Sequence, residues 1–319
     1  MMSGSNTQGK SRICAADGLA IAEAAATLRG GGIVAIPTET VYGLAADASN
    51  PRAVAEIYRT KGRPDFNPLI VHVADREAAQ RIARFDGLAD KLADAFWPGP
   101  LTLVLPLLDG AAIAKAVTAG LPTIALRMPA HVVMRSVLMA SGLNLAAPSA
   151  NRSGGISPTR AEHVAASLGE AAPMILDGGL CRAGIESTIV AVRDNGWQLL
   201  RPGPITAEAI TKVAGSAMIG AAADKIEAPG QMASHYAPSK PVRRNAEAPR
   251  DGEWMIGFGP VTGDDTLSAG SDLAEAAARL FDALHRADAS PKAAIAIAAI
   301  PMEGVGIAIN DRLARAAVR

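Results

Sequence analysis

Short apolar runs alternate with Ala-rich stretches over residues 13–215, and this pattern constrains the fold more than any other feature of the chain. The runs at 32–37 and 69–73 have the length of buried strands, whereas the stretch 19–28 has helical composition. These segments do not follow a strict strand–helix repeat, and residues 194–196 (DNG) between two strand-like runs indicate a hairpin. We therefore predict an α/β fold whose twisted sheet contains strands of both directions.

The composition changes after residue 215, which indicates a second domain. Residues 216–240 contain an Ala/Gly stretch followed by prolines, which is typical of a linker. Beyond it, strand-like and helical segments alternate at 253–258, 273–286, 293–298 and 310–318. We predict a flexible tail at 1–12, a larger domain at 13–215, a linker at 216–240 and a small Rossmann-like α/β domain at 241–319. A length of 319 residues fits two domains of about 150 residues each.

Charge and composition exclude several classes of protein. Lys plus Arg and Asp plus Glu both number 31, and aromatic residues make up only 3%, so neither a nucleic-acid coat nor a base-stacking surface is indicated. No apolar run approaches the 18 residues of a membrane helix. Cys14 and Cys181 lack CxxC spacing, which predicts a reduced, cytoplasmic protein, and the five histidines do not cluster as zinc ligands do.

Polar clusters lie at or next to the strand-like runs at residues 37–44, 61–68, 123–129, 147–157 and 186–203; the cluster at 61–68 follows a helix and precedes a strand. Ligands of open α/β sheets bind beyond strand ends, so these clusters are candidates for one binding site. Each cluster alone is also explained as a turn, a helix end or a structural ion pair. Five of them in one domain favour a shared site that binds anions.

The second cluster carries the clearest chemical signal. Gly62 and Pro64 restrict the backbone on both sides of Arg63, which favours an aimed guanidinium next to Lys61. His72 alone is more typical of a buried core histidine. The common nucleotide-binding motifs are missing: there is no GxxxxGK[ST] loop, and residues 257–260 (GFGP) fail the GxGxxG spacing.

These motifs, taken together and in order, resemble a known family. Residues 37–44 (PTETVYGL), 61–64 (KGRP), 149–151 (SAN) and 186–190 (ESTIV) are similar to the YrdC-like fold of L-threonylcarbamoyladenylate synthases. Residues 228–232 (APGQM), 235–238 (HYAP) and 306–313 (GIAINDRL) resemble its longer, two-domain branch, although Ala233 and Ser234 stand where that branch often has a basic or aromatic pair.

The resemblance implies an enzyme, a nucleotidyltransferase. It would make threonylcarbamoyl-adenylate and pyrophosphate from ATP, L-threonine and bicarbonate, with Mg²⁺ held by ATP rather than by side chains. Its product would pass to the proteins that complete the N6-threonylcarbamoyl modification of adenosine 37 in tRNAs reading ANN codons. Direct tRNA binding is left open.

The resemblance also implies roles for individual residues. The phosphate-gripping, catalytic set would be Lys61, Arg63, Ser149 and Asn151. Further ATP contacts would come from Asn67, Thr123, Ser157, Arg201 and Tyr236. Threonine would be bound by Thr40, His72, Arg127, Ala147 and Ser187.

The linker residues His235 and Tyr236 are expected to close over bound nucleotide as a lid; the alternative is that they only dock the linker on the domain surface. Two other functions compete with the synthase. The first is an RNA-binding module, which the neutral charge and few aromatics disfavour. The second is an enzyme that uses carbamoyl phosphate, which the lack of Cys-rich zinc elements disfavours.

Overall fold

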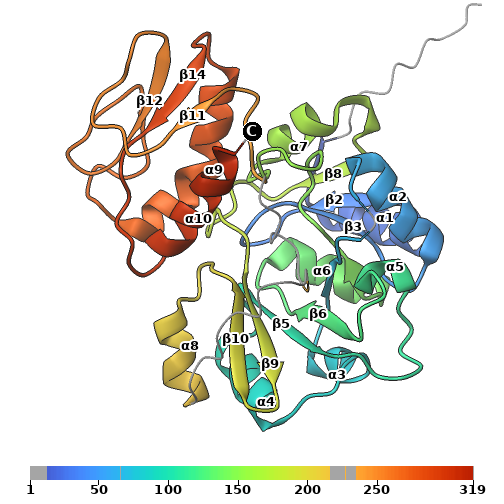
Figure 1. Ribbon diagram of the computed structural model, residues 1–319. Coiled ribbons are helices and arrows are strands. Elements are labelled where there is room, and N and C mark those ends of the chain that lie inside the picture. Colours follow the sequence, from blue (N-terminus) through green and yellow to red (C-terminus); the bar gives the residue numbers. More distant parts are fainter. Residues whose placement is uncertain (1–12, 65, 216–226, 228–234, 319) are drawn as a thin grey trace, which may run out of the picture.

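The computed structural model describes residues 13–64, 66–215, 227 and 235–318, which form a larger and a smaller α/β part (Figure 1). The predicted tail, and most of the predicted linker, lie outside the described residues. In the larger part, the strands form one sheet in the order β1 (Ile13–Ala15), β8 (Met174–Asp177), β2 (Val34–Ile36), β3 (Gly43–Asp47), β7 (Leu145–Ala146), β4 (Ile70–His72), β6 (Thr123–Arg127), β5 (Leu101–Pro106), β9 (Thr188–Arg193) and β10 (Gly196–Arg201).

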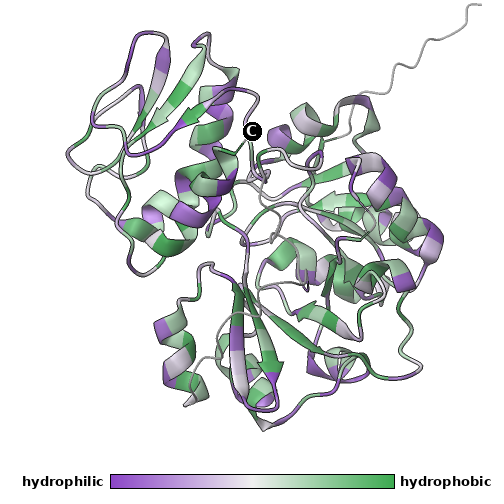
Figure 2. Ribbon diagram, viewed as in Figure 1, coloured by the Kyte–Doolittle hydropathy of each residue, from purple (hydrophilic) through white to green (hydrophobic). Residues whose placement is uncertain are grey.

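Parallel and antiparallel neighbours both occur in this sheet, which confirms the predicted mixed sheet. For example, β4 and β6 are parallel, whereas β9 and β10 form the predicted antiparallel hairpin. The helices of this part are α1 (Gly18–Arg29), α2 (Pro51–Lys61), α3 (Arg76–Gln80), α4 (Gly87–Phe96), α5 (Lys115–Thr118), α6 (Val132–Ser141), α7 (Ala161–Leu168) and α8 (Ala207–Ala214). Figure 2 shows that the strands are mainly hydrophobic, as expected for a sheet buried between helices.

Helix α2 shows how local sequence places a cluster of cationic side chains. The Asn50 side chain accepts hydrogen bonds from the first-turn amides, and Pro51 occupies the first turn, as its fixed φ allows. The helix ends at Gly62, whose φ of 59° is the left-handed conformation that glycine adopts without strain. The chain therefore turns sharply between Lys61 and Arg63.

The smaller part contains the parallel sheet β11 (Val242–Arg243), β14 (Ala294–Ile297), β12 (Glu253–Gly257) and β13 (Asp265–Thr266). Helices α9 (Leu273–Ala289) and α10 (Gly306–Ala316) lie on the side that faces the larger part (Figure 1). Helix α10 begins four residues before the predicted start at Asn310. A Cβ at Gly306 would lie 2.1 Å from the Pro301 carbonyl oxygen, so only glycine lets the helix begin there.

Strand β3 and helix α3 also differ from the sequence predictions. Strand β3 is not predicted by the pattern, because its residues are small and it directly follows a polar cluster. Helix α3 ends at Gln80 rather than near Phe85, because Ala83 pairs with Leu107 as a β-bridge and is drawn out of the helix.

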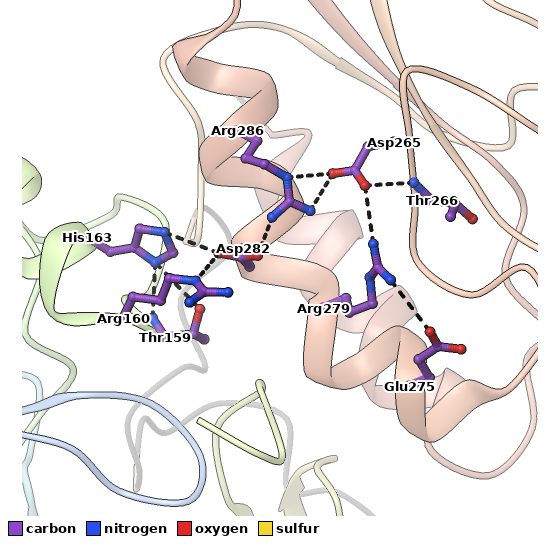
Figure 3. A network of polar contacts seen from close by, with 9 residues as sticks. All are labelled: Thr159, Arg160, His163, Asp265, Thr266, Glu275, Arg279, Asp282 and Arg286. Carbon is purple, nitrogen blue, oxygen red and sulfur yellow. Dashed lines mark hydrogen bonds and ion pairs between the residues drawn. The ribbon is translucent and has the colours of Figure 1, made fainter. Parts of the chain in front are cut away.

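A polar network joins the two parts of the molecule (Figure 3). Arg160, which precedes α7, donates to Asp282 on α9 over 2.8 Å. The rings of His163 and His285 stack across the same boundary with centroids 3.8 Å apart. Figure 3 also shows Arg286 between Asp282 and Asp265, so positive and negative charges alternate along the network.

We expect the stacked histidines to make the protein sensitive to mild acid. Burial, with the neighbouring ring, lowers the pKa of His163 to about 3, and burial lowers the pKa of His285. In the unfolded chain both titrate near pH 6.5, so their neutral pairing stabilises the fold above that pH and is lost as pH falls toward 3. We expect the free energy of unfolding to fall between pH 7 and pH 5, by up to about 1.4 kcal/mol per pH unit for each histidine.

Urea denaturation of the wild type and of His163→Gln at pH 7, 6 and 5 measures this effect. The variant should lose less stability per pH unit than the wild type, since one of the two neutral imidazoles is gone. Equal pH dependence in both proteins would contradict the assignment to this pair.

Candidate active site

A cavity opens against one face of the larger sheet, beneath the smaller part. Ile70 and His72 on β4 share this face, since alternate residues of a strand point the same way, and Arg127 pairs in register with His72. The cavity has a volume of about 50 Å³, and the empty space around it, including open solvent at its mouth, is about 540 Å³. It is lined by Thr38, Thr40, Val41, Gly43, Arg63, Ile70, His72, Arg127, Ala147, Pro148, Ser149, Glu186, Ser187, Arg201, His235 and Tyr236.

One end of the cavity carries buried positive charge. The Lys61 ammonium donates to the carbonyl oxygens of Ser149 and Asn151, and the Arg63 guanidinium donates to the Pro68 carbonyl oxygen over 3.0 Å. Burial lowers the pKa of Arg63 to about 10; burial and the adjacent Arg63 hold the pKa of Lys61 well below its usual value. Within the described part of the chain, no carboxylate pairs with either side chain, so this end suits an anionic ligand.

The other end is built around Arg127. Its guanidinium lies 2.7 Å from a Glu39 carboxylate oxygen and donates to the Thr40 hydroxyl over 2.8 Å. Although burial favours the neutral acid, Arg127 keeps the pKa of Glu39 below its ordinary value. Burial and Arg127 lower the pKa of His72 to about 3, so His72 is a neutral imidazole at physiological pH. This end presents a fixed guanidinium, a hydroxyl and a neutral ring.

A third set of contacts joins strand ends near Ser187. The Ser187 hydroxyl lies 2.7 Å from that of Thr102, and Arg201 donates to the Ser187 hydroxyl and carbonyl oxygen over 3.1 and 3.0 Å. The adjacent Glu186 accepts from the Ser157 hydroxyl over 2.5 Å. Ser187 and Arg201 are thereby held rigidly in the wall.

His235 and Tyr236 line the cavity. Their rings are arranged edge to face with centroids 4.1 Å apart, and Tyr236 is almost fully buried. Tyr236 has a φ of 63°, a conformation that its surroundings must hold because the side chain disfavours it. The Tyr236 hydroxyl and the Nδ1 atoms of His72 and His235 find no hydrogen-bond partner among the described residues. Buried polar atoms facing a cavity indicate groups that a ligand satisfies.

The structure brings most of the predicted site residues together. The wall contains Thr40, Arg63, His72, Arg127, Ala147, Ser149, Ser187, Arg201, His235 and Tyr236. Lys61 and Ser157 lie behind the wall and contact it through hydrogen bonds to Ser149 and Glu186, whereas Asn151 accepts a hydrogen bond from Lys61 through its carbonyl oxygen. Asn67 presents its backbone carbonyl oxygen to Arg63.

Thr123 is not brought to the cavity. It begins β6, and Arg127 ends it, so the two are separated by four residues, about 13 Å of strand. Thr123 lines a separate surface hollow with Arg84 and Asn195.

Sequence reasoning assigned no role to Thr38, Glu39, Glu186 and Arg312, which all take part in or support the wall. Thr38 binds the Thr40 hydroxyl, Glu39 pairs with Arg127, and Glu186 pairs with Arg312 at 3.0 Å. Thr38, Glu39 and Glu186 lie inside the polar clusters that mark the site. Arg312 lies inside the 306–313 motif, but nothing in that motif indicates its partner, which is 126 residues away.

Two features bear on metals and membranes. Over residues 13–64, 66–215, 227 and 235–318, no group of three or more His, Cys, Asp or Glu side chains is arranged to hold a metal ion. In the same residues, no helix combines the length and the apolar character needed to span a bilayer.

Comparison with known proteins agrees with the fold and the site. A family model described as "Telomere recombination", which groups Sua5, YciO and YrdC proteins, matches residues 26–203. A model of the threonylcarbamoyl-AMP synthase C-terminal domain matches residues 205–318. Threonylcarbamoyl-AMP synthases of Pyrococcus abyssi and Bacillus subtilis are 40% and 41% identical over 92% and 93% of this chain, and 92% of each relative is covered.

Solved structures give the same result. Sua5 of P. abyssi, complexed with L-threonine, matches with a TM-score of 0.86 and 38% identity over 96% of both chains. Escherichia coli YciO, 19% identical with a TM-score of 0.53, shares the fold of the larger part and covers 61% of this chain and 96% of its own. The chain therefore belongs to the threonylcarbamoyl-AMP synthase family of tRNA-modifying nucleotidyltransferases.

Proposed function

We propose that this protein makes L-threonylcarbamoyladenylate and pyrophosphate from ATP, L-threonine and bicarbonate. The observation that carries the proposal is that three basic side chains lie at one buried cavity: Lys61 behind its wall, Arg63 in the wall, and Arg127 in the wall beside the Thr40 hydroxyl. The first two suit a polyphosphate, and the third suits an amino-acid carboxylate. The P. abyssi relative, solved with L-threonine, supports threonine as the amino acid.

The reaction requires the protein mainly to position the substrates and to stabilise negative charge. The threonine amine adds to the carbon of CO₂ to give a carbamate and its proton passes to water or base; with bicarbonate, the amine displaces hydroxide, which leaves with the amine proton as water. A carbamate oxygen then attacks the α-phosphorus of ATP, and the bond to the β-phosphate bridging oxygen breaks to release pyrophosphate. Charge on the phosphates rises as that bond breaks, so fixed cations stabilise the transition state.

Individual residues follow from this division of the cavity. Lys61, Arg63, Ser149 and Asn151 would hold the phosphates, and Asn67, Arg201 and Tyr236 would add ATP contacts. Ser157 would reach ATP only by giving up its hydrogen bond to Glu186. Thr40, His72, Arg127, Ala147 and Ser187 would bind threonine.

Mg²⁺ would enter the site bound to ATP, as the substrate MgATP, and would neutralise negative charge on the phosphate groups. The carboxylates of the wall, Glu39 and Glu186, are each paired with an arginine and so suit a metal ligand poorly. Phosphate oxygens and water would therefore supply the coordination. The product would pass in the cytoplasm to proteins that modify adenosine 37 of tRNAs reading ANN codons.

His235 and Tyr236 would act as a lid that keeps water from the labile carbamate. We expect Tyr236→Ala to lower kcat/KM more than tenfold and to reduce the product formed per pyrophosphate released, because water then reaches the site. Tyr236→Phe keeps the ring and should lose much less. Quantifying pyrophosphate and product in the same reaction tests both variants; equal yields in Tyr236→Ala and the wild type would contradict a lid.

Mass spectrometry of the product tests the proposed function itself. Reactions contain MgATP, L-threonine and either ordinary or ¹³C-labelled bicarbonate, and the product should gain one mass unit with the label. Adenylate that forms from carbamoyl phosphate but not from threonine and bicarbonate would overturn the proposal.

A further inference from the structure

Arg312 reaches the wall of the cavity from the other side of the boundary between the two parts. It lies on α10, and its side chain is fully buried. Its Nε donates to a Glu186 carboxylate oxygen over 3.0 Å, and its Nη1 donates to the Pro202 carbonyl oxygen over 2.7 Å. Its guanidinium also lies 5.4 Å from the centre of the Tyr236 ring. One side chain thus contacts two wall segments and the proposed lid.

We propose that Arg312 is a positioning residue for the synthase reaction, through which the C-terminal domain completes the active site. The inference rests on the proposed function, because its effect is on the binding and reaction of ATP and threonine. Through Arg312 the smaller domain supports catalysis indirectly, without any contact between that domain and the reacting atoms.

The first argument concerns the two segments that Arg312 joins. Glu186 precedes Ser187, and Pro202 follows Arg201, so Arg312 holds the neighbour of each wall residue. The segments already pack closely: a Cβ at Gly203 would lie 2.4 Å from the Thr188 amide nitrogen. Loss of the guanidinium would free both segments and loosen the contact of Arg201 with Ser187.

The second argument concerns charge. Burial alone would raise the pKa of Glu186, but Arg312 and Arg201 keep it below its ordinary value, so Glu186 is an anion inside the wall. With Arg312 present, the Glu186 carboxylate is paired with a guanidinium that comes from the smaller domain. Without it, Arg201 would be the remaining cation for Glu186 and would be less available to a phosphate group.

The third argument concerns the lid. The face of the Tyr236 ring receives the Arg312 cation, while the same ring lies 5.6 Å from Phe281 on α9. A cation over an aromatic face is attractive, and more so when both are desolvated. Both helices of the smaller domain therefore hold Tyr236 in its left-handed backbone conformation.

A matched control separates this role from a general hold between the domains. Arg160 crosses the same boundary to Asp282, yet it contacts no residue of the wall through that pair and is partly exposed. Arg312→Met keeps the apolar stem and removes the charge, and Arg312→Lys keeps a charge with a single donor group. Arg160→Ala breaks a domain contact alone.

The experiment measures kcat and KM for MgATP and for L-threonine in the full-length wild type and in these three variants, with thermal unfolding as the check of folding. We expect Arg312→Met to lose at least 30-fold in kcat/KM, Arg312→Lys to recover part of it, and Arg160→Ala to stay within threefold. The double variant Glu186→Gln/Arg312→Met should lose less kcat/KM than the product of the two single-variant losses. The reason is that the carboxylate left without Arg312 is then removed as well.

Several results would overturn the inference. Near-wild-type kcat/KM in Arg312→Met would remove it, and an equal loss in Arg160→Ala would assign the effect to domain docking in general. A wild type that makes no threonylcarbamoyl-adenylate would instead refute the proposed function. In that case, calorimetric titration with L-threonine and with MgATP decides the positioning role: equal affinities in wild type and Arg312→Met would refute it, and weaker binding in the variant would sustain it.

Discussion

Arg63→Ala is expected to abolish most product formation while the protein remains folded. Arg63 is buried in the cavity wall, and burial lowers its pKa to about 10, so it is a poorly hydrated cation with strong affinity for phosphate oxygens. Losing charge-assisted contacts of this kind costs about 2–4 kcal/mol in the transition state, roughly 30- to 1,000-fold in rate. Pyrophosphate release and product mass spectrometry, with circular dichroism as a check of folding, measure the effect.

Arg59 provides the matched control for this variant. It lies on the same helix, α2, one turn before Gly62, but its side chain is 75% exposed and pairs with Glu56 on the surface. Arg59→Ala should keep nearly full activity, because exposed ion pairs contribute little. Lys61→Ala should resemble Arg63→Ala. Near-normal turnover in both cavity variants would remove the phosphate-binding assignment.

Valine should be used at least 1,000-fold less efficiently than threonine, and serine only about 10- to 200-fold less. The physical reason lies in His72, which is neutral and whose buried Nδ1 finds no hydrogen-bond partner within the described residues. A threonine hydroxyl can satisfy that atom or the nearby Ser187, whereas a valine methyl leaves buried polar groups unpaired. Serine keeps the hydroxyl and loses only the contacts of one methyl group.

Ratios of kcat/KM for the three amino acids, in the wild type and in His72→Leu, test this prediction. The variant should bring threonine and valine closer together, because the polar partner of the hydroxyl is gone. Equal use of valine by the wild type would show that the hydroxyl is not recognised.

The fold could be predicted from sequence wherever a local signal existed. Asn50 and Pro51 marked the start of α2, Asp75 marked that of α3, and residues 194–196 marked the β9–β10 hairpin. Strand β3 gave no such signal, because its pairing with β2 and β7 decides its conformation. The two-residue strands β11 and β13 were missed for the same reason: their hydrogen bonds come entirely from distant neighbours.

The candidate site could likewise be predicted only where nearby residues in the sequence indicated it. Polar clusters marked most of the wall, since a strand end that carries several polar residues stands out in the sequence. The pairing of Glu186 with Arg312 could not be predicted, because nothing in either segment specifies a partner 126 residues away. Thr123 shows the opposite case: it lies beside Arg127 in one cluster, yet the extended strand separates the two.

The long separation between Glu186 and Arg312 also affects how the protein is made. Ribosomes synthesise the chain from its N-terminus to its C-terminus, so Arg312 is added after every residue that lines the cavity. The larger domain can collapse earlier, but Glu186 in its wall would then have Arg201 as its remaining cation. Contacts of such high sequence separation form late, because loop closure must come first. Full catalytic efficiency would thus arise only at the end of translation, and chains that end before Arg312 would use ATP and threonine less efficiently.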